Sequence, residues 1–171
     1  MQEGSGEKEW TQDNSPGIDG LRLKSIRIKS DGLVTENPSL NKEINIEIDY
    51  LNEIENENFF VSIHLVNEAG ITAFTSSNFE GASIEKDEWA YKKYEKGHYR
   101  TICTIPSFLL NDGIYSVNIF INKKIDWKAL INVQDAITFK VNDSIEMRTD
   151  FSGKWVGIVR PKLGWKTTKV I

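Results

Sequence analysis

Hydroxyl, amide, imidazole and aromatic side chains stand at every second position of several short apolar runs in this chain. The outward-facing candidates are His64, His98, Arg100, Ser116, Asn118 and Phe120. Such groups suit a saccharide, whose C–H faces stack on aromatic rings and whose hydroxyls pair with neutral polar groups. Phe120 is unusual as a large apolar residue among polar neighbours, and ordinary packing beneath a loop explains it equally well.

Large aromatic residues also stand in polar, loop-like segments, where exposure to water is costly. Trp89, Tyr91 and Trp127 are candidates for a platform on which a sugar ring stacks. They could equally well hold their own loops in place. If the ligand carries a carboxylate or phosphate, Arg100 is the first choice of partner, with Lys123 or Lys124 in reserve.

The sequence gives little support to catalysis, a metal or a cofactor. Clustered acids such as Asp87 and Glu88 could form a glycosidase pair, but their polar surroundings favour a solvated surface. His64 and His98 are far apart and lack neighbouring ligands, which argues against zinc. The chain has neither a phosphate-binding loop nor a Gly-x-Ser-x-Gly motif. Cys103 lies in an alternating run and reads as a small buried apolar residue.

The segments that position these residues alternate between apolar and polar side chains, with a period of two residues. Ile44, Ile46, Ile48 and Tyr50 alternate with polar residues, which is typical of a strand with one buried face. Four further alternating runs lie within residues 61–65, 99–105, 115–122 and 137–141.

Turn signals such as Ser30-Asp31-Gly32 and Asn111-Asp112-Gly113 separate the runs. Short strands joined by regular turns predict an all-β fold, an antiparallel sandwich of jelly-roll or immunoglobulin-like type. Residues 82–96 are polar and read as a long connection with a helical turn.

Charge is unevenly distributed along the chain. Residues 1–19 contain five acidic residues and one lysine, which accounts for the net charge of −4. We expect residues 1–18 to be a linker or loosely held arm, with Trp10 either docked or exposed, and residues 19–171 to form one domain. The domain is not basic overall, which argues against nucleic acid. No apolar run approaches the ~20 residues of a membrane span, so no direct membrane insertion is expected.

Three segments, read in order, carry a family resemblance. They are the strand Gly20–Ile28, the hairpin Val61–Ile71 that runs into Asn78, and the C-terminal text "DGIYSVNIFI … DAITFKV … GIVRPKLGW". Over roughly residues 17–165 this order resembles the C-terminal carbohydrate-binding domain of Wzt proteins, the ATP-binding subunits of transporters that export lipopolysaccharide O-antigen.

The resemblance implies a non-catalytic module that recognises the end of an O-antigen polysaccharide, with a cap at the non-reducing terminus. It adds Ser76, Ser77 and Asn78 to the candidates, although a satisfied turn would also explain them. ATP and the transporter permease would be partners only of a separate ATPase domain, at the cytoplasmic face of the inner membrane. The alternative from another class is a structural dimerisation domain without a ligand.

The C-terminal part of the sequence also predicts a homodimer. A strand-like run from Lys154 to Val159 ends at Pro161, and apolar residues such as Leu163 and Trp165 follow. An unpaired terminal strand after a linker can be exchanged between two copies as a domain swap, and the resemblance implies dimeric transporters. The alternative is a final strand that folds back on its own sheet.

Overall fold

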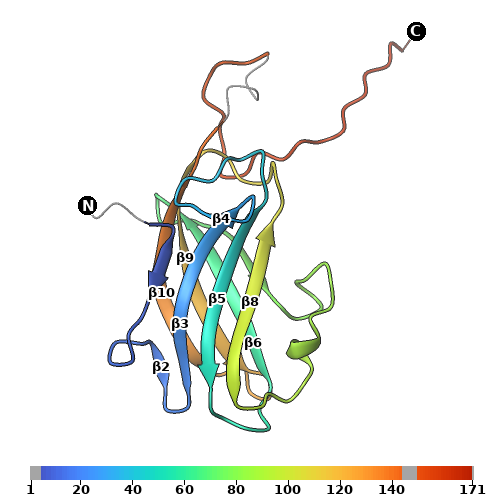
Figure 1. Cartoon of the computed structure of the whole chain (residues 1–171). Helices are drawn as coiled ribbons and strands as arrows, with labels where there is room; N and C mark the ends of the chain where they lie inside the picture. Colours follow the sequence, from blue (N-terminus) through green and yellow to red (C-terminus); the bar gives the residue numbers. More distant parts are fainter. Residues whose placement is uncertain (1–4, 144–149, 171) are drawn as a thin grey trace.

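The computed structural model describes residues 5–143 and 150–170, and these residues form two packed antiparallel sheets (Figure 1). The elements are β1 (Glu7–Glu9), β2 (Gly17–Ile18), β3 (Leu21–Ser30), β4 (Leu33–Val34), β5 (Ile44–Asn52), β6 (Phe59–Asn67), β7 (Thr72–Ser77), η1 (Glu88–Ala90), β8 (Gly97–Ile105), β9 (Gly113–Lys123) and β10 (Ala129–Val141). The first sheet has the order β1-β3-β5-β8, with β2 and β4 also paired to β3. The second has the order β10-β9-β6-β7.

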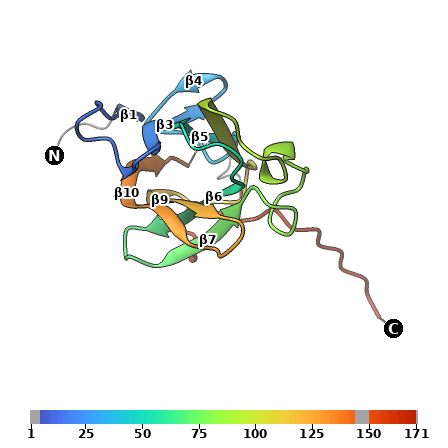
Figure 2. The same ribbon diagram turned by 90° about the horizontal axis from the view of Figure 1, so that it is seen from below.

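The two sheets lie face to face, as the end-on view in Figure 2 shows. Their facing apolar residues are buried between them. Ile44, Ile46, Ile48 and Tyr50 of β5 are all 2% exposed or less, so the alternation expected for this strand is confirmed. The prediction of an all-β antiparallel sandwich is therefore correct. Removing these side chains from water is the main stabilising contribution to such a fold.

Local sequence explains the turns and the few irregularities. Ser30 pairs with Leu33, so Asp31 and Gly32 alone form the β3–β4 turn, and both have positive φ, at 51° and 77°. This is a two-residue hairpin of the kind that favours Asp-Gly. The helical turn expected within residues 82–96 is present as η1, which Asp87 caps by accepting a hydrogen bond from the backbone N–H of Trp89.

The N-terminal arm is more ordered than a loose linker. Strand β1 pairs with β3 from Glu7 opposite Arg27 to Glu9 opposite Ser25, and Trp10 donates its backbone N–H to Lys24 at 2.9 Å. Trp10 also packs against the core. Of the two alternatives for this residue, docked or exposed, the structure therefore shows the docked one. The arm covers the β3 edge of the first sheet (Figure 1).

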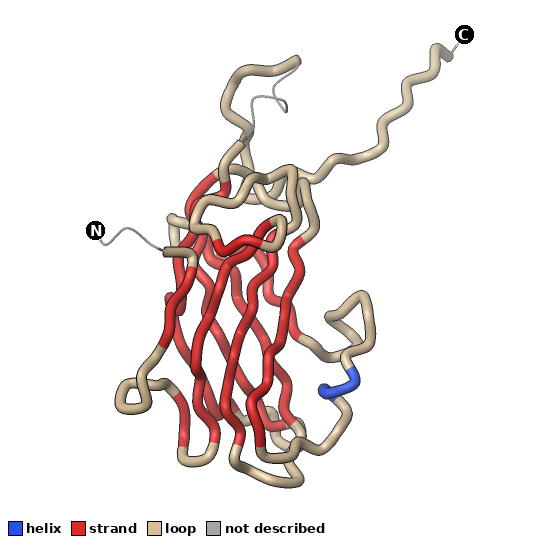
Figure 3. Tube along the Cα trace, viewed as in Figure 1, coloured by secondary structure: helices blue, strands red, loops and turns tan. Residues whose placement is uncertain are grey.

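The strand expected from Lys154 to Val159 is not formed. In the described residues after β10, Val159 makes only an isolated bridge to Leu110. Arg160 is 9% exposed and forms an ion pair with Asp143 at 3.0 Å, which anchors the segment to the end of the sandwich. Beyond this anchor the chain runs outward without regular structure (Figure 3), and Trp165 is 91% exposed.

Candidate carbohydrate-binding face

The outer surface of the β10-β9-β6-β7 sheet brings several of the expected residues together. The inward residues of β6 and β9, such as Ile63 and Ile119, are buried, so the alternate positions point outward. We call this surface the polar face. It comprises Ser62, His64, Ser77, Ser116, Asn118 and Phe120.

Cross-strand register sets which of these side chains are neighbours. His64 lies opposite Asn118, and Ser62 lies between Phe120 on β9 and Ser77 on β7. The rings of His64 and Phe120 are 4.4 Å apart between centroids, with a 39° tilt. Phe120 is therefore half-buried and in contact with an outward imidazole. The pair is a partly exposed aromatic surface surrounded by hydroxyl and amide groups.

Strand β10 bulges beside this pair. Its register shifts between Val133 and Ile137, so extra residues lie opposite Asn118, and Asp135 adopts a φ of 48°. The amide oxygen of Asn118 accepts the backbone N–H of Asp135 at 2.8 Å. Bulges of this kind redirect side chains and are common next to binding sites. Here the bulge holds the Asn118 amide in a fixed orientation, with only 7% of the residue exposed.

An aromatic cluster borders the polar face at one end. Phe60 is on the same side of β6 as Ser62, and its ring lies 5.4 Å from Phe79 and 5.3 Å from Trp127. Trp127 is 59% exposed. The ammonium of Lys124 lies 5.7 Å from the Phe60 ring and 4.5 Å from the Tyr91 ring. Trp127 thus extends the aromatic surface from Phe60, and the Lys124 ammonium lies against both Phe60 and Tyr91.

Other expected residues lie elsewhere. Ser76 pairs with Ile63 and so faces inward, and it lines a cleft of about 770 Å³ between β7 and β8. Ser77 and Asn78 line the same cleft, so the structure brings these three candidates together there. The Asn78 side chain accepts from the backbone of Val61 and donates to Asp87, which ties the connection after β7 to the sheet. Trp89 packs on Tyr94 and Tyr99 at the β8 edge.

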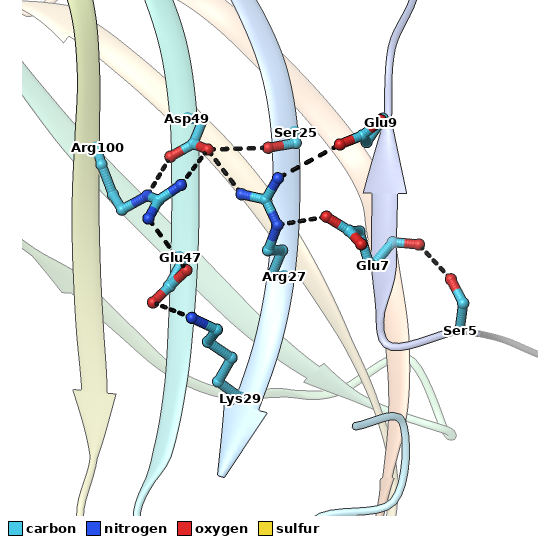
Figure 4. Close-up of polar contacts among 9 residues, drawn as sticks. All are labelled: Ser5, Glu7, Glu9, Ser25, Arg27, Lys29, Glu47, Asp49 and Arg100. Carbon is cyan, nitrogen blue, oxygen red and sulfur yellow. Dashed lines mark hydrogen bonds and ion pairs between the residues drawn. The ribbon is translucent and has the colours of Figure 1, made fainter. Parts of the chain in front are cut away.

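His98 and Arg100 are on the outer surface of the opposite sheet, far in the fold from the polar face. The guanidinium of Arg100 donates two hydrogen bonds to the Asp49 carboxylate, from Nε at 2.6 Å and from Nη2 at 2.8 Å. Both residues belong to the ion-pair network in Figure 4. Lys123 forms an ion pair with Glu57 at 2.9 Å. Of the three basic residues considered for an anionic ligand, only Lys124 borders the polar face without an ion-pair partner among the described residues.

The residues considered for catalysis have structural partners. Asp87 bonds to Asn78 and to the η1 backbone, and Glu88 forms an ion pair with Lys92. Cys103 is half-buried, and burial raises the pKa of its thiol, which disfavours the reactive thiolate. Among residues 5–143 and 150–170 no group of three metal-ligating side chains occurs. Helices long and apolar enough to cross a membrane are also absent from these residues.

Fold and face together define an antiparallel β-sandwich domain with a polar, aromatic outer sheet. Among solved structures it is similar to the C-terminal domain of Wzt, with a TM-score of 0.69 and 16% identity over 95% of this chain and 89% of that one. The expected resemblance to Wzt is confirmed at the level of the fold. A weaker similarity, with a TM-score of 0.37 and 12% identity, is to chicken MD-1 complexed with lipid IVa, over 73% of this chain and 92% of that one. No family model and no curated protein matches the sequence.

Proposed function

We propose that this chain is a non-catalytic carbohydrate-binding module for an O-antigen polysaccharide. The observation that carries the proposal is the contact between His64 and Phe120, an aromatic surface surrounded by hydroxyl and amide groups from three neighbouring strands. Aromatic stacking and fixed neutral polar groups are the chemistry that a sugar ring requires. The Wzt-like fold supports the choice of O-antigen as the ligand class.

The ligand contact is expected at a chain end, as the resemblance to Wzt implies. Recognition of a finished, capped terminus would couple chain completion to export. The module would then act at the cytoplasmic face of the inner membrane, joined to a permease through an ATPase domain. It has no catalytic role in this proposal.

Titration of the chain with the O-polysaccharide of its own source tests the proposal. A sugar bound on the outer face of a sheet gains little from apolar burial, so we expect a Kd between micromolar and millimolar; ~1 mM corresponds to ~4 kcal/mol. Phe120→Ala should weaken binding about tenfold or more, because it removes the stacking surface. Ile102→Ala is the matched control, an exposed apolar residue on the outer face of the opposite sheet.

Each outcome of this titration has a defined meaning. No binding of the cognate polymer by wild-type protein contradicts the module and favours the structural dimerisation domain. Equal affinity of the Phe120 and Ile102 variants removes the polar face from the site. Loss of binding after enzymatic removal of the terminal sugar supports recognition of the chain end, and unchanged binding points to the repeat unit.

We also propose that the C-terminal segment pairs two copies of the chain. Leu163, Trp165 and Val170 extend beyond the Arg160 anchor, and Trp165 is almost fully exposed. Apolar side chains gain free energy on leaving water, so a segment of this composition is suited to contact a partner surface. The segment also carries Lys162, Lys166 and Lys169, and carboxylates are therefore expected on the surface that receives it.

A further inference from the structure

The outer surface of the first sheet contains a groove that is separate from the polar face. We call it the arm groove. It lies between Trp10 of the N-terminal arm and His98 and Arg100 of β8, above Ser25, Arg27 and Asp49. Its volume is about 480 Å³, within the range of small-molecule sites.

The bottom of the arm groove is a network of fixed hydrogen bonds. Asp49 accepts two from Arg100, at 2.6 and 2.8 Å, one from Arg27 at 2.7 Å and one from Ser25 at 3.1 Å. Arg27 is also paired with Glu7 on β1 (Figure 4). Each guanidinium is thus held on two sides, and the donors at the bottom of the groove are in place before any ligand arrives.

Charges of opposite sign alternate across the network. Beyond Arg100, Glu47 pairs with that guanidinium at 3.8 Å and with Lys29 at 3.2 Å (Figure 4). The acids are Glu7, Glu9, Asp49 and Glu47, since Glu9 also pairs with Arg27 at 3.4 Å. They are balanced by Arg27, Arg100 and Lys29 of the network and by Lys24, which lines the groove. An ion entering the groove would meet a near-neutral surface, and the attraction that concentrates charged ligands in a basic cleft is missing. A neutral ligand with paired hydroxyls suits this surface better, because each hydroxyl both donates and accepts.

One wall of the groove is aromatic, and local sequence positions it. The register between β3 and β5 shifts at Lys24, between Leu23 and Ser25, which makes a bulge next to the groove. The carbonyl of Lys24 accepts the backbone N–H of Trp10 at 2.9 Å, so the bulge and the arm are fixed together. These contacts fix the backbone of Trp10, and its indole packs against the core and lines the groove next to the charged network. The ammonium of Lys8 lies 5.3 Å from the indole centroid.

We propose that the arm groove is a second carbohydrate site, which binds one neutral sugar residue. The C–H face of the pyranose would stack on Trp10, and two neighbouring hydroxyls would pair with the guanidinium groups of Arg27 and Arg100 and with the imidazole of His98. The site shares the ligand class of the proposed function but none of its residues. Either site can be absent without the other.

Nuclear magnetic resonance on the full chain tests the proposal with defined probes. The probes are the methyl glycosides of glucose, mannose and galactose, with sodium glucuronate as a charged comparator. At least one neutral glycoside, up to about 100 mM because a single sugar binds weakly, should shift the indole N–H of Trp10 and the Nε–H of Arg27 or Arg100. A Trp10→Phe spectrum assigns the indole signal.

Variants separate the arm groove from the polar face. Trp10→Ala should weaken binding at least tenfold, read at the Arg100 Nε–H, whereas Phe120→Ala should leave it unchanged. Asp49→Asn, which is nearly the same size, is the second variant and should also weaken binding because it releases both arginines. The proposal is overturned if no neutral glycoside moves these signals in the wild-type protein, if only glucuronate moves them, or if both variants bind as the wild type does.

Discussion

The guanidinium of Arg100 donates two parallel hydrogen bonds to the carboxylate of Asp49, at 2.6 and 2.8 Å, across the β5–β8 pair. The two residues are 51 positions apart in the chain and directly opposite in the sheet. Because this charge is already compensated, Arg100 is an unsuitable first partner for an anionic ligand. The same contact makes Asp49 the centre of the network below the arm groove.

The loss of folding stability at acid pH should depend on Asp49. Burial by itself raises the pKa of Asp49, but hydrogen bonds from Arg100, Arg27 and Ser25 outweigh it and lower the pKa from 3.8 to about 2. A lowered pKa in the folded state stabilises the fold above the ordinary value, and this stabilisation is lost as the pH falls from about 4 to about 2. Urea midpoints measured across this range should therefore fall less steeply in Asp49→Asn than in the wild type.

Asp31→Asn provides the control for this measurement. Asp31 pairs with Lys42 at 3.4 Å, and both side chains are at least half exposed. Exposed pairs of this kind contribute little to stability. The assignment to Asp49 is contradicted if both variants lose stability at acid pH as steeply as the wild type does.

Asn52 should be required for stability because it joins two loops from a fully buried position. Its amide donates to the carbonyls of Ile54 and Glu95, at 2.7 and 2.9 Å, and accepts the backbone N–H of Ile54. Asn52→Ala leaves these backbone groups without partners, so we expect a loss of about 2–3 kcal/mol in the free energy of unfolding. Chemical denaturation measures this, and a loss below about 0.5 kcal/mol would show that water replaces the amide.

Lys124 should contribute to binding when the polysaccharide end carries a phosphate or carboxylate. Its ammonium lies over the rings of Tyr91 and Phe60 at the border of the polar face. Lys124→Ala should weaken binding of such a ligand about tenfold, or ~1.4 kcal/mol, and the loss should diminish at high salt.

The neighbouring Lys123 is a matched control, because Glu57 already holds its ammonium. Lys123→Ala should leave the affinity within about twofold of the wild type. Calorimetric titrations measure the affinity of both lysine variants for the anionic ligand. Equal losses would indicate a general effect of charge, and no loss in either would exclude an anionic contact at this border.

The segment after Pro161 should hold two copies together. The intact chain is expected to have a mass near twice 19.5 kDa in light scattering. Deletion of residues 162–171 should give a folded monomer, because Arg160 and its partner Asp143 remain. A monomeric intact chain at high concentration, or a dimer that survives the deletion, would contradict this prediction. Trp165→Ser is a milder variant that should weaken the dimer without shortening the chain.

The period-two pattern of the sequence was sufficient to predict the class of fold and the facing of most side chains. Alternation around Ile63 and Ile119 places His64 and Asn118 outward whichever strands are neighbours, because successive side chains in a strand point to opposite faces. The Asp31-Gly32 turn was likewise predictable, since few residues other than Gly, Asn and Asp adopt positive φ readily.

Only the tertiary structure decided which outward side chains meet. Strand β8 joins the sheet of β5, so Arg100 and His98 lie opposite the face that carries Phe120, although all three alternate in the same way. Ser76 and Ser77 are adjacent in sequence and both line the cleft, yet Ser76 lies opposite the buried Ile63 and Ser77 opposite Ser62 of the polar face. Strand pairing depends on hydrogen bonds between segments far apart in the chain, and side-chain period contains no information about that choice. The sequence by itself therefore determined most of the strands and their solvent-facing sides. The pairing of β5 with β8 and of β6 with β9 determined which residues form the two proposed binding surfaces.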